Sequence, residues 1–139
     1  MPTIKFYLAE DLQRRISEIV SVLGLGHVDI ARVVAVRSIG SASRRTIARC
    51  YALPRIWQAA LARKAVYLVE VISERYDRLS EEEKDRVLIH EIMHIPASFG
   101  GGFRHHKNYV TERNVESLYR EYVKRRGKGQ ETLLSSPGE

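Results

Sequence analysis

Apolar positions in the first half of the chain follow first a helical period and then a pattern typical of β-strands. Between positions 8 and 23, leucine and isoleucine recur every three or four residues, which predicts a helix with one apolar face. Residues 28–38 are rich in β-branched side chains, and a Gly-Ser turn separates them from a second predicted strand over 44–53. We expect these two strands to form an antiparallel hairpin with a basic tip.

The second half of the chain also contains predicted helices and strands. Residues 55–63 predict a short helix, and 65–73 predict the clearest strand because apolar side chains fall on both of its faces. A helix over 81–95 is expected to begin at the cap Ser80 and to end before a proline, and a last helix is expected over 109–126. The order α-β-β-α-β-α-α predicts an α+β fold, in which helices pack on a small, mostly antiparallel sheet.

Length and composition indicate the general class of protein. The chain has 139 residues, of which 44% are apolar and 29% charged, so we expect one globular domain over 1–126 and a flexible tail over 127–139. No apolar run approaches the roughly 20 residues that span a bilayer, and the first residues lack a secretory pattern. The single cysteine, Cys50, excludes an internal disulfide framework. These features predict a cytoplasmic protein without a membrane segment.

The net charge of +6 is distributed unevenly along the chain. Basic residues exceed acidic ones in 1–55 and again in 104–128, and most of them are arginine. Arginine-rich surfaces bind phosphate groups, but they also serve simply to keep a small protein in solution. Nucleic acid or nucleoprotein is therefore a partner class that the charge allows. The stretch 37–49 has a second interpretation, in which it folds onto the acidic segment 70–85.

The most informative motif is His90-Glu91-Ile92-Met93-His94, which falls within the predicted helix 81–95. Residues four apart lie on one face of a helix, so two imidazoles at this spacing can bind one zinc ion. Glu91 lies beside the metal position rather than in it, where a carboxylate can act as a general base. The apolar residues around the motif predict a buried helix. Burying two histidines and a glutamate is unfavourable unless these groups have partners, and a bound metal would explain their presence there.

A catalytic zinc usually has three protein ligands. The remaining nearby histidines are His105 and His106, and the glycines between them and His94 allow the chain to turn back over the metal. Glu112 and Glu116, on the next predicted helix, are alternative third ligands.

The segment VLIHEIMHIPASFGGGFRHH (87–106) resembles the phage-type metallopeptidases found in archaea, bacteria and their viruses. The pattern of that family is His-Glu-x-x-His-Ile-Pro, then Phe, a Gly-Gly turn, an Arg-Pro-His element and a helix. Here Arg104 matches the arginine, His105 stands at the usual proline and His106 matches the histidine. The similarity extends to 37–49, 53–61 and 71–84. The resemblance implies a zincin-like fold, zinc peptidase activity and a third ligand at His106.

These observations support two functions. The first is a zinc metallopeptidase that acts on proteins or peptides, with zinc on His90, His94 and His106 and with Glu91 as general base. Its substrate is expected to pair with the strand 65–73. The second is a nucleic-acid-associated protein in which the basic segments make the contact and the zinc is structural. The sequence does not specify the oligomeric state.

Three further residues receive structural interpretations. Trp57 is predicted to lie in the core, because it stands on a helix between two leucines, and Cys50 is predicted to pack as a small apolar group. Tyr109 has two interpretations, a hydrogen bond to the reacting oxyanion or simple packing.

Overall fold

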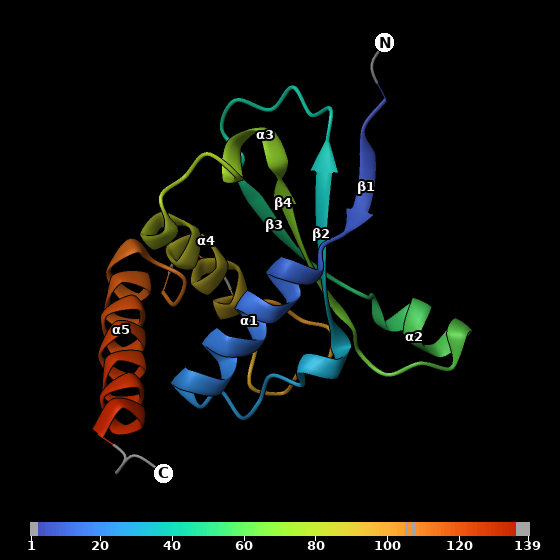
Figure 1. Cartoon of the computed structure of the whole chain (residues 1–139). Coiled ribbons are helices and arrows are strands. Elements are labelled where there is room, and N and C mark those ends of the chain that lie inside the picture. The colour runs from blue at the N-terminus through green and yellow to red at the C-terminus, as the bar shows by residue number, and fades with distance from the viewer. Residues whose placement is uncertain (1–2, 105, 107, 136–139) are drawn as a thin grey trace.

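A four-stranded mixed sheet forms the centre of the molecule. The computed structural model describes residues 3–104, 106 and 108–135. The strands lie in the order β1-β2-β4-β3 (Figure 1). Their bounds are Lys5–Leu8 (β1), Val33–Ile39 (β2), Ala48–Ala52 (β3) and Tyr67–Ile72 (β4). β4 pairs parallel with β2 and antiparallel with β3, and β1 pairs antiparallel with β2. The predicted α+β class is confirmed, with two of the three pairings antiparallel.

The predicted hairpin between the second and third strands is wrong, because β4 lies between β2 and β3. Tyr67, Val69 and Val71 on one face of β4 are fully buried, and Ile72 on the other face is nearly so. A strand with buried side chains on both faces is most stable in the middle of a sheet. The segment 40–47 therefore carries the chain across the end of β4 to the far edge of the sheet (Figure 1).

Three long helices pack together on one face of the sheet. They are α1 (Glu10–Leu23), α4 (Glu81–Met93) and α5 (Glu112–Ser135), and α1 and α5 flank α4 (Figure 1). Their buried apolar side chains join those of β2 and β4 in one core. The short elements are η1 (Ile30–Arg32), a 3₁₀ turn, and the helices α2 (Arg55–Leu61) and α3 (Ser73–Tyr76). Among the described residues, none of the helices has the length and apolar character needed to cross a membrane.

Several element bounds differ from those predicted. β1 was not predicted, because all four of its residues are exposed and no alternation of buried and exposed positions marks it. The predicted strand 28–38 begins with η1, because the Asp29 side chain accepts a hydrogen bond from the Ala31 amide and caps a turn there.

The last helix also differs from its prediction. α5 begins at Glu112, where the Thr111 side chain caps the first turn, and continues past the predicted end at 126 as far as Ser135. The predicted flexible tail 127–139 is therefore helical over most of its length, and 136–139 lie outside the described residues. The assignment of residues 1–126 to a domain separate from the tail stays a prediction.

The basic stretch 37–49 does fold onto the acidic segment, as one of its two interpretations expected. Arg37 forms an ion pair with Asp77 at 2.9 Å, and the Gly40 amide donates a hydrogen bond to the Glu74 carboxylate at 2.7 Å. These contacts anchor the start of the crossing segment to α3.

Candidate metal centre

The helix α4 presents its two histidines at its C-terminal end. Ser80 caps the helix by accepting a hydrogen bond from the Glu83 amide, as its sequence predicts. Leu88 and Ile89 bury the middle of the helix in the core. His90 then lies one turn before His94, and the centroids of their rings are 5.2 Å apart on one side of the helix. The predicted helix and the i, i+4 placement of its histidines are both present in the structure.

The loop that follows α4 turns back toward the helix. Phe99 and Gly101 adopt positive φ angles of 48° and 105°, and the Arg104 amide donates a hydrogen bond to the His94 carbonyl at 2.8 Å. Gly101 has a second constraint, because a Cβ there would lie 2.6 Å from Nε2 of Gln58. This reversal carries His106 back to the two histidines of α4.

A buried tyrosine from the sheet holds the returning loop in place. The Tyr67 hydroxyl donates a hydrogen bond to the Gly102 carbonyl at 2.8 Å and accepts one from the Gly101 amide at 3.0 Å. Gln58 donates to the Gly100 carbonyl at 3.3 Å. The position of the loop therefore depends on side chains from β4 and α2.

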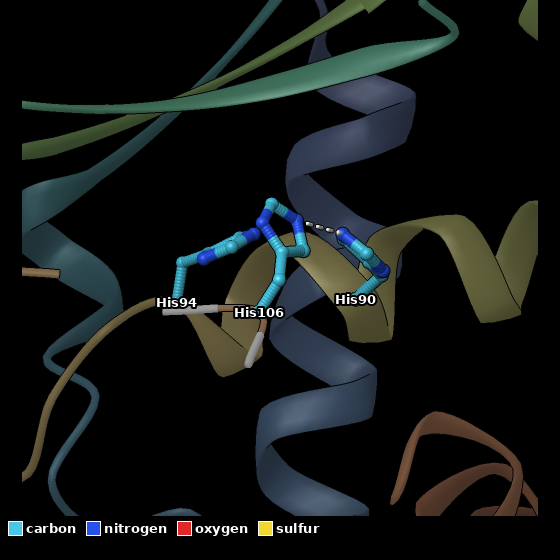
Figure 2. Close-up of side chains that lie close together, drawn as sticks. All are labelled: His90, His94 and His106. Carbon is cyan, nitrogen blue, oxygen red and sulfur yellow. Dashed lines mark hydrogen bonds between the residues drawn. The ribbon is translucent and has the colours of Figure 1, made fainter. Parts of the chain in front are cut away.

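Three imidazoles converge as a result. The ligand atoms of His90, His94 and His106 all lie within 4.8 Å of one another, and the rings point toward a common centre (Figure 2). Nε2 of His90 and Nε2 of His106 are 3.2 Å apart. Two nitrogens that bind one tetrahedral ion at 2.0–2.1 Å stand about 3.3 Å apart, so this pair matches the spacing that zinc requires.

The protonation of the histidines also suits a metal. Burial, followed by the neighbouring His94 and His106, lowers the pKa of His90 to about 4, so its imidazole is neutral at physiological pH. Nδ1 of His94 lies 2.7 Å from the Arg104 carbonyl oxygen, which can only accept a hydrogen bond. Nδ1 must therefore carry the proton in neutral His94, and Nε2 has the lone pair that binds a metal.

Glu91 lies next to the three imidazoles but is not one of the three candidate metal ligands. Its side chain is 9% exposed, and its Oε2 lies 3.9 Å from Nε2 of His90. Burial raises the pKa of Glu91 to about 7. A carboxylate whose pKa is near the working pH can both accept and return a proton.

A cleft of about 420 Å³ lies over the three histidines and Glu91. Its opposite wall is β3, contributed by Ala48 to Tyr51, and its remaining wall is formed by Phe103 and Arg104. The sequence pattern of residues 48–52 did not predict β3 as part of the site. The strand order that brings it there is a tertiary feature, and no local signal in residues 48–52 marks them as an edge beside α4.

The alternative third ligands lie elsewhere. Glu116 forms an ion pair with Arg86 at 2.9 Å, and that pair ties α5 to α4. Glu112 lines the neighbouring hollow beside His90. Among the residues that the structure describes, neither carboxylate joins the group of three imidazoles. His105 lies outside the described residues, so the choice between it and His106 stays a prediction.

Four other predictions can be compared with the structure. The strand 65–73 cannot pair with a substrate, because β4 is hydrogen-bonded on both sides; of the two edge strands in the described sheet, β1 and β3, it is β3 that lines the cleft. Trp57 is not a core residue, since 55% of it is exposed on α2. Cys50 packs against the core as predicted, and burial raises its pKa to about 12. Tyr109 packs under the Arg104 guanidinium, 4.0 Å from its ring centre.

The site and the family comparison together indicate the class of the protein. Three convergent imidazoles and an adjacent buried carboxylate, placed in a cleft, are typical of metal-dependent hydrolases. The chain matches the family described as "Putative phage metallopeptidase" over residues 4–135, and it belongs to that family. The resemblance seen in residues 87–106 is thus confirmed. No curated protein and no solved structure shows a significant match to the chain.

Proposed function

We propose that this protein is a zinc-dependent peptidase of zincin-like design that hydrolyses peptide bonds in proteins or peptides. The observation that carries the proposal is the convergence of His90, His94 and His106 beside the buried Glu91. The three nitrogens would hold zinc and leave one position of a tetrahedral site open. The family supplies the reaction class, since its name is that of a metallopeptidase.

The roles of the residues follow from their positions. Zinc, when bound, lowers the pKa of water toward 7 and polarises a carbonyl group. The Glu91 carboxylate accepts the proton of the water that attacks the peptide carbonyl, and it returns that proton to the amine that leaves. The Arg104 carbonyl keeps His94 in the tautomer that binds metal.

The substrate is proposed to bind in an extended conformation along β3. Among the described residues β3 pairs only with β4, so its other edge has free amide and carbonyl groups facing the cleft. A peptide can add to such an edge as a further strand, in hydrogen bonds that do not depend on its sequence. This replaces the predicted pairing with 65–73.

The test is cleavage of an unfolded protein, such as denatured casein, by the zinc-loaded chain. Glu91→Gln should keep zinc and the fold but lose activity by a factor of about 100 or more, because an amide cannot accept the proton. The matched control is Glu82→Gln, an exposed position on the first turn of the same helix. If Glu91→Gln and Glu82→Gln cleave equally fast, Glu91 is not the base.

The nucleic-acid alternative stays a prediction, and no contact among the described residues favours it. Arg37 is bound to Asp77, and Arg125 to Glu121 at 2.8 Å, so some arginines of the basic segments are engaged within the protein. The proposed cytoplasmic location rests on the single cysteine of the sequence.

A further inference from the structure

A second hollow lies at the end of the edge strand, away from the metal centre. It has a volume of about 500 Å³ and is lined mainly by apolar side chains from β3, α2 and β4; we call it the α2 hollow. Its principal walls are Tyr51, Trp57, Leu61, Val66 and Leu68. Trp57 and Leu61 are about half exposed, at 55% and 50%. Large apolar side chains gathered at a surface hollow mark a binding site for an apolar group.

The hollow opens on the face of the sheet opposite the three long helices. Tyr51 pairs directly with Leu68, so their side chains share one face. Leu68 alternates with Tyr67 and Val69, which are buried under the helices, and it therefore faces the other way. Cys50, by contrast, packs toward the helices and the metal cleft.

The metal cleft and the α2 hollow both border β3, each on its own face of the sheet. The cleft is lined by residues Ala48 to Tyr51 of the strand, and the hollow begins at Tyr51, which lines both. A peptide added to this edge extends the sheet, so its successive side chains point alternately to the two faces. Side chains on one face enter the metal cleft, and those on the other pass over the α2 hollow.

The distance along the strand fixes which substrate residue reaches the hollow. The cleft is lined by Ala48 to Tyr51 and the hollow by Tyr51 to Pro54, so the two are offset by about two to four residues of an extended chain, at about 3.3 Å each. Antiparallel pairing is the more stable and more common arrangement, and in it the N-terminal part of the peptide lies beside the C-terminal end of β3. The hollow at that end therefore meets a residue N-terminal to the cleaved bond.

The rim of the hollow has a positive charge. Arg55, Arg63 and Lys64 are exposed around α2, and Arg63 also lines the hollow. The sequence contains no acidic residue between Leu53 and Val69, and the next residue, Glu70, is buried and accepts a hydrogen bond from the Tyr51 hydroxyl at 2.6 Å. An acidic side chain near the apolar one would be attracted to this rim, whereas a basic one would be repelled.

We propose that the α2 hollow is a specificity site for the substrate, which receives a bulky apolar side chain about two to four residues N-terminal to the cleaved bond. The favoured substrates are extended segments in which acidic residues flank that side chain. This inference rests on the proposed peptidase function, because the position of the apolar residue is counted from the cleaved bond.

Cleavage of a tryptic peptide mixture, followed by mass spectrometry of the new ends, tests the proposal. We expect leucine, phenylalanine and methionine to be enriched at one position N-terminal to the new cleavage sites. Trp57→Ala and Leu61→Ala should each lower that enrichment by about tenfold, as loss of an apolar contact does. The matched control is Ile56→Ala, since Ile56 lies on the same helix and is exposed but does not line the hollow.

A binding measurement separates this inference from the peptidase function. Trp57 is the only tryptophan of the chain, so its fluorescence reports directly on the hollow. The probes are ten-residue peptides of Ala, Ser and Asp in which a single Leu moves from position to position, titrated into the Glu91→Gln variant. A blue shift with the Leu peptides but not with the Leu-free peptide supports the proposal, and replacing Asp by Lys should weaken the binding.

The outcomes differ according to which idea fails. If the parent cleaves peptides with no apolar preference and Trp57 emission does not respond, the specificity site is overturned and the peptidase function stands. If the parent cleaves nothing while Leu peptides still shift the emission, the peptidase function and the cleavage preference are overturned, and the hollow is a peptide-binding site of another kind. If Ile56→Ala changes the preference as much as Trp57→Ala, the hollow is not the selecting element.

Discussion

At the scale of single residues, the site is held by contacts that the motif itself does not include. The spacing of His90 and His94 is fixed by the helix, so the sequence alone was sufficient to predict that pair. His106 is different, because its position depends on a loop reversal at Phe99 and Gly101 and on a tyrosine 39 residues earlier in the chain. No local pattern contains that information, and only the family resemblance favoured His106 over His105.

The first prediction separates these two neighbouring histidines. His106→Ala should lower zinc affinity by a factor of about 100 or more, because it leaves two protein ligands where a tight site needs three. His105→Ala should reduce the affinity at most by about the tenfold typical of an indirect contact. Titration of zinc against a competing chelator measures both values.

A reversed order of these effects would place the third ligand on His105. If neither variant loses zinc, the third ligand lies elsewhere, and Glu112, which lines the hollow beside His90, becomes the first candidate to exchange. His27→Ala serves as the control, since His27 lies outside the group of three convergent imidazoles.

At the scale of helices and strands, a prediction was accurate where the residues that determine the element lie within the element itself. α4 was predicted nearly to its bounds, because its cap at Ser80 and its apolar period lie within the helix itself. The hairpin was wrong because strand order depends on which strand is most buried, and β4 takes the central place through contacts on both faces. That same reordering leaves β3 at the edge, where it forms one wall of the metal cleft.

The loop after α4 gives a prediction at this scale. Tyr67→Phe removes one hydroxyl that serves both the Gly101 amide and the Gly102 carbonyl, so two backbone groups lose their partner. The free energy of unfolding should fall by about 1–3 kcal/mol. Zinc affinity should also fall by about tenfold, because the loop that positions His106 is less constrained.

The control for this variant is Tyr7→Phe, an exposed tyrosine on β1. Chemical denaturation and chelator titration should show both effects in Tyr67→Phe and neither in Tyr7→Phe. Reduced stability with unchanged zinc affinity would mean that the tyrosine supports the core but does not position the metal ligands.

At the scale of the whole molecule, the position of α4 depends on the two helices that flank it. Asp85 on α4 is 3% exposed and forms an ion pair with Arg15 of α1 at 2.8 Å, and its other oxygen lies 3.7 Å from Arg126 of α5. Arg15 also reaches Glu81, on the first turn of α4, at 2.6 Å. Three helices far apart in the sequence therefore meet at one buried carboxylate, which the pattern of apolar residues could not predict.

This network gives the last prediction. Asp85→Asn removes the buried one of the two carboxylates that pair with the Arg15 guanidinium and leaves only the exposed Glu81, which should lower the free energy of unfolding by about 2–3 kcal/mol. The loss is smaller than for a fully buried pair, because 26% of the Arg15 side chain remains in water. Glu121→Gln breaks the exposed pair with Arg125 and should leave the urea midpoint unchanged. If Asp85→Asn unfolds at the same urea concentration as Glu121→Gln, apolar packing alone sets the position of α4, and the metal centre does not depend on the ion pairs between the helices.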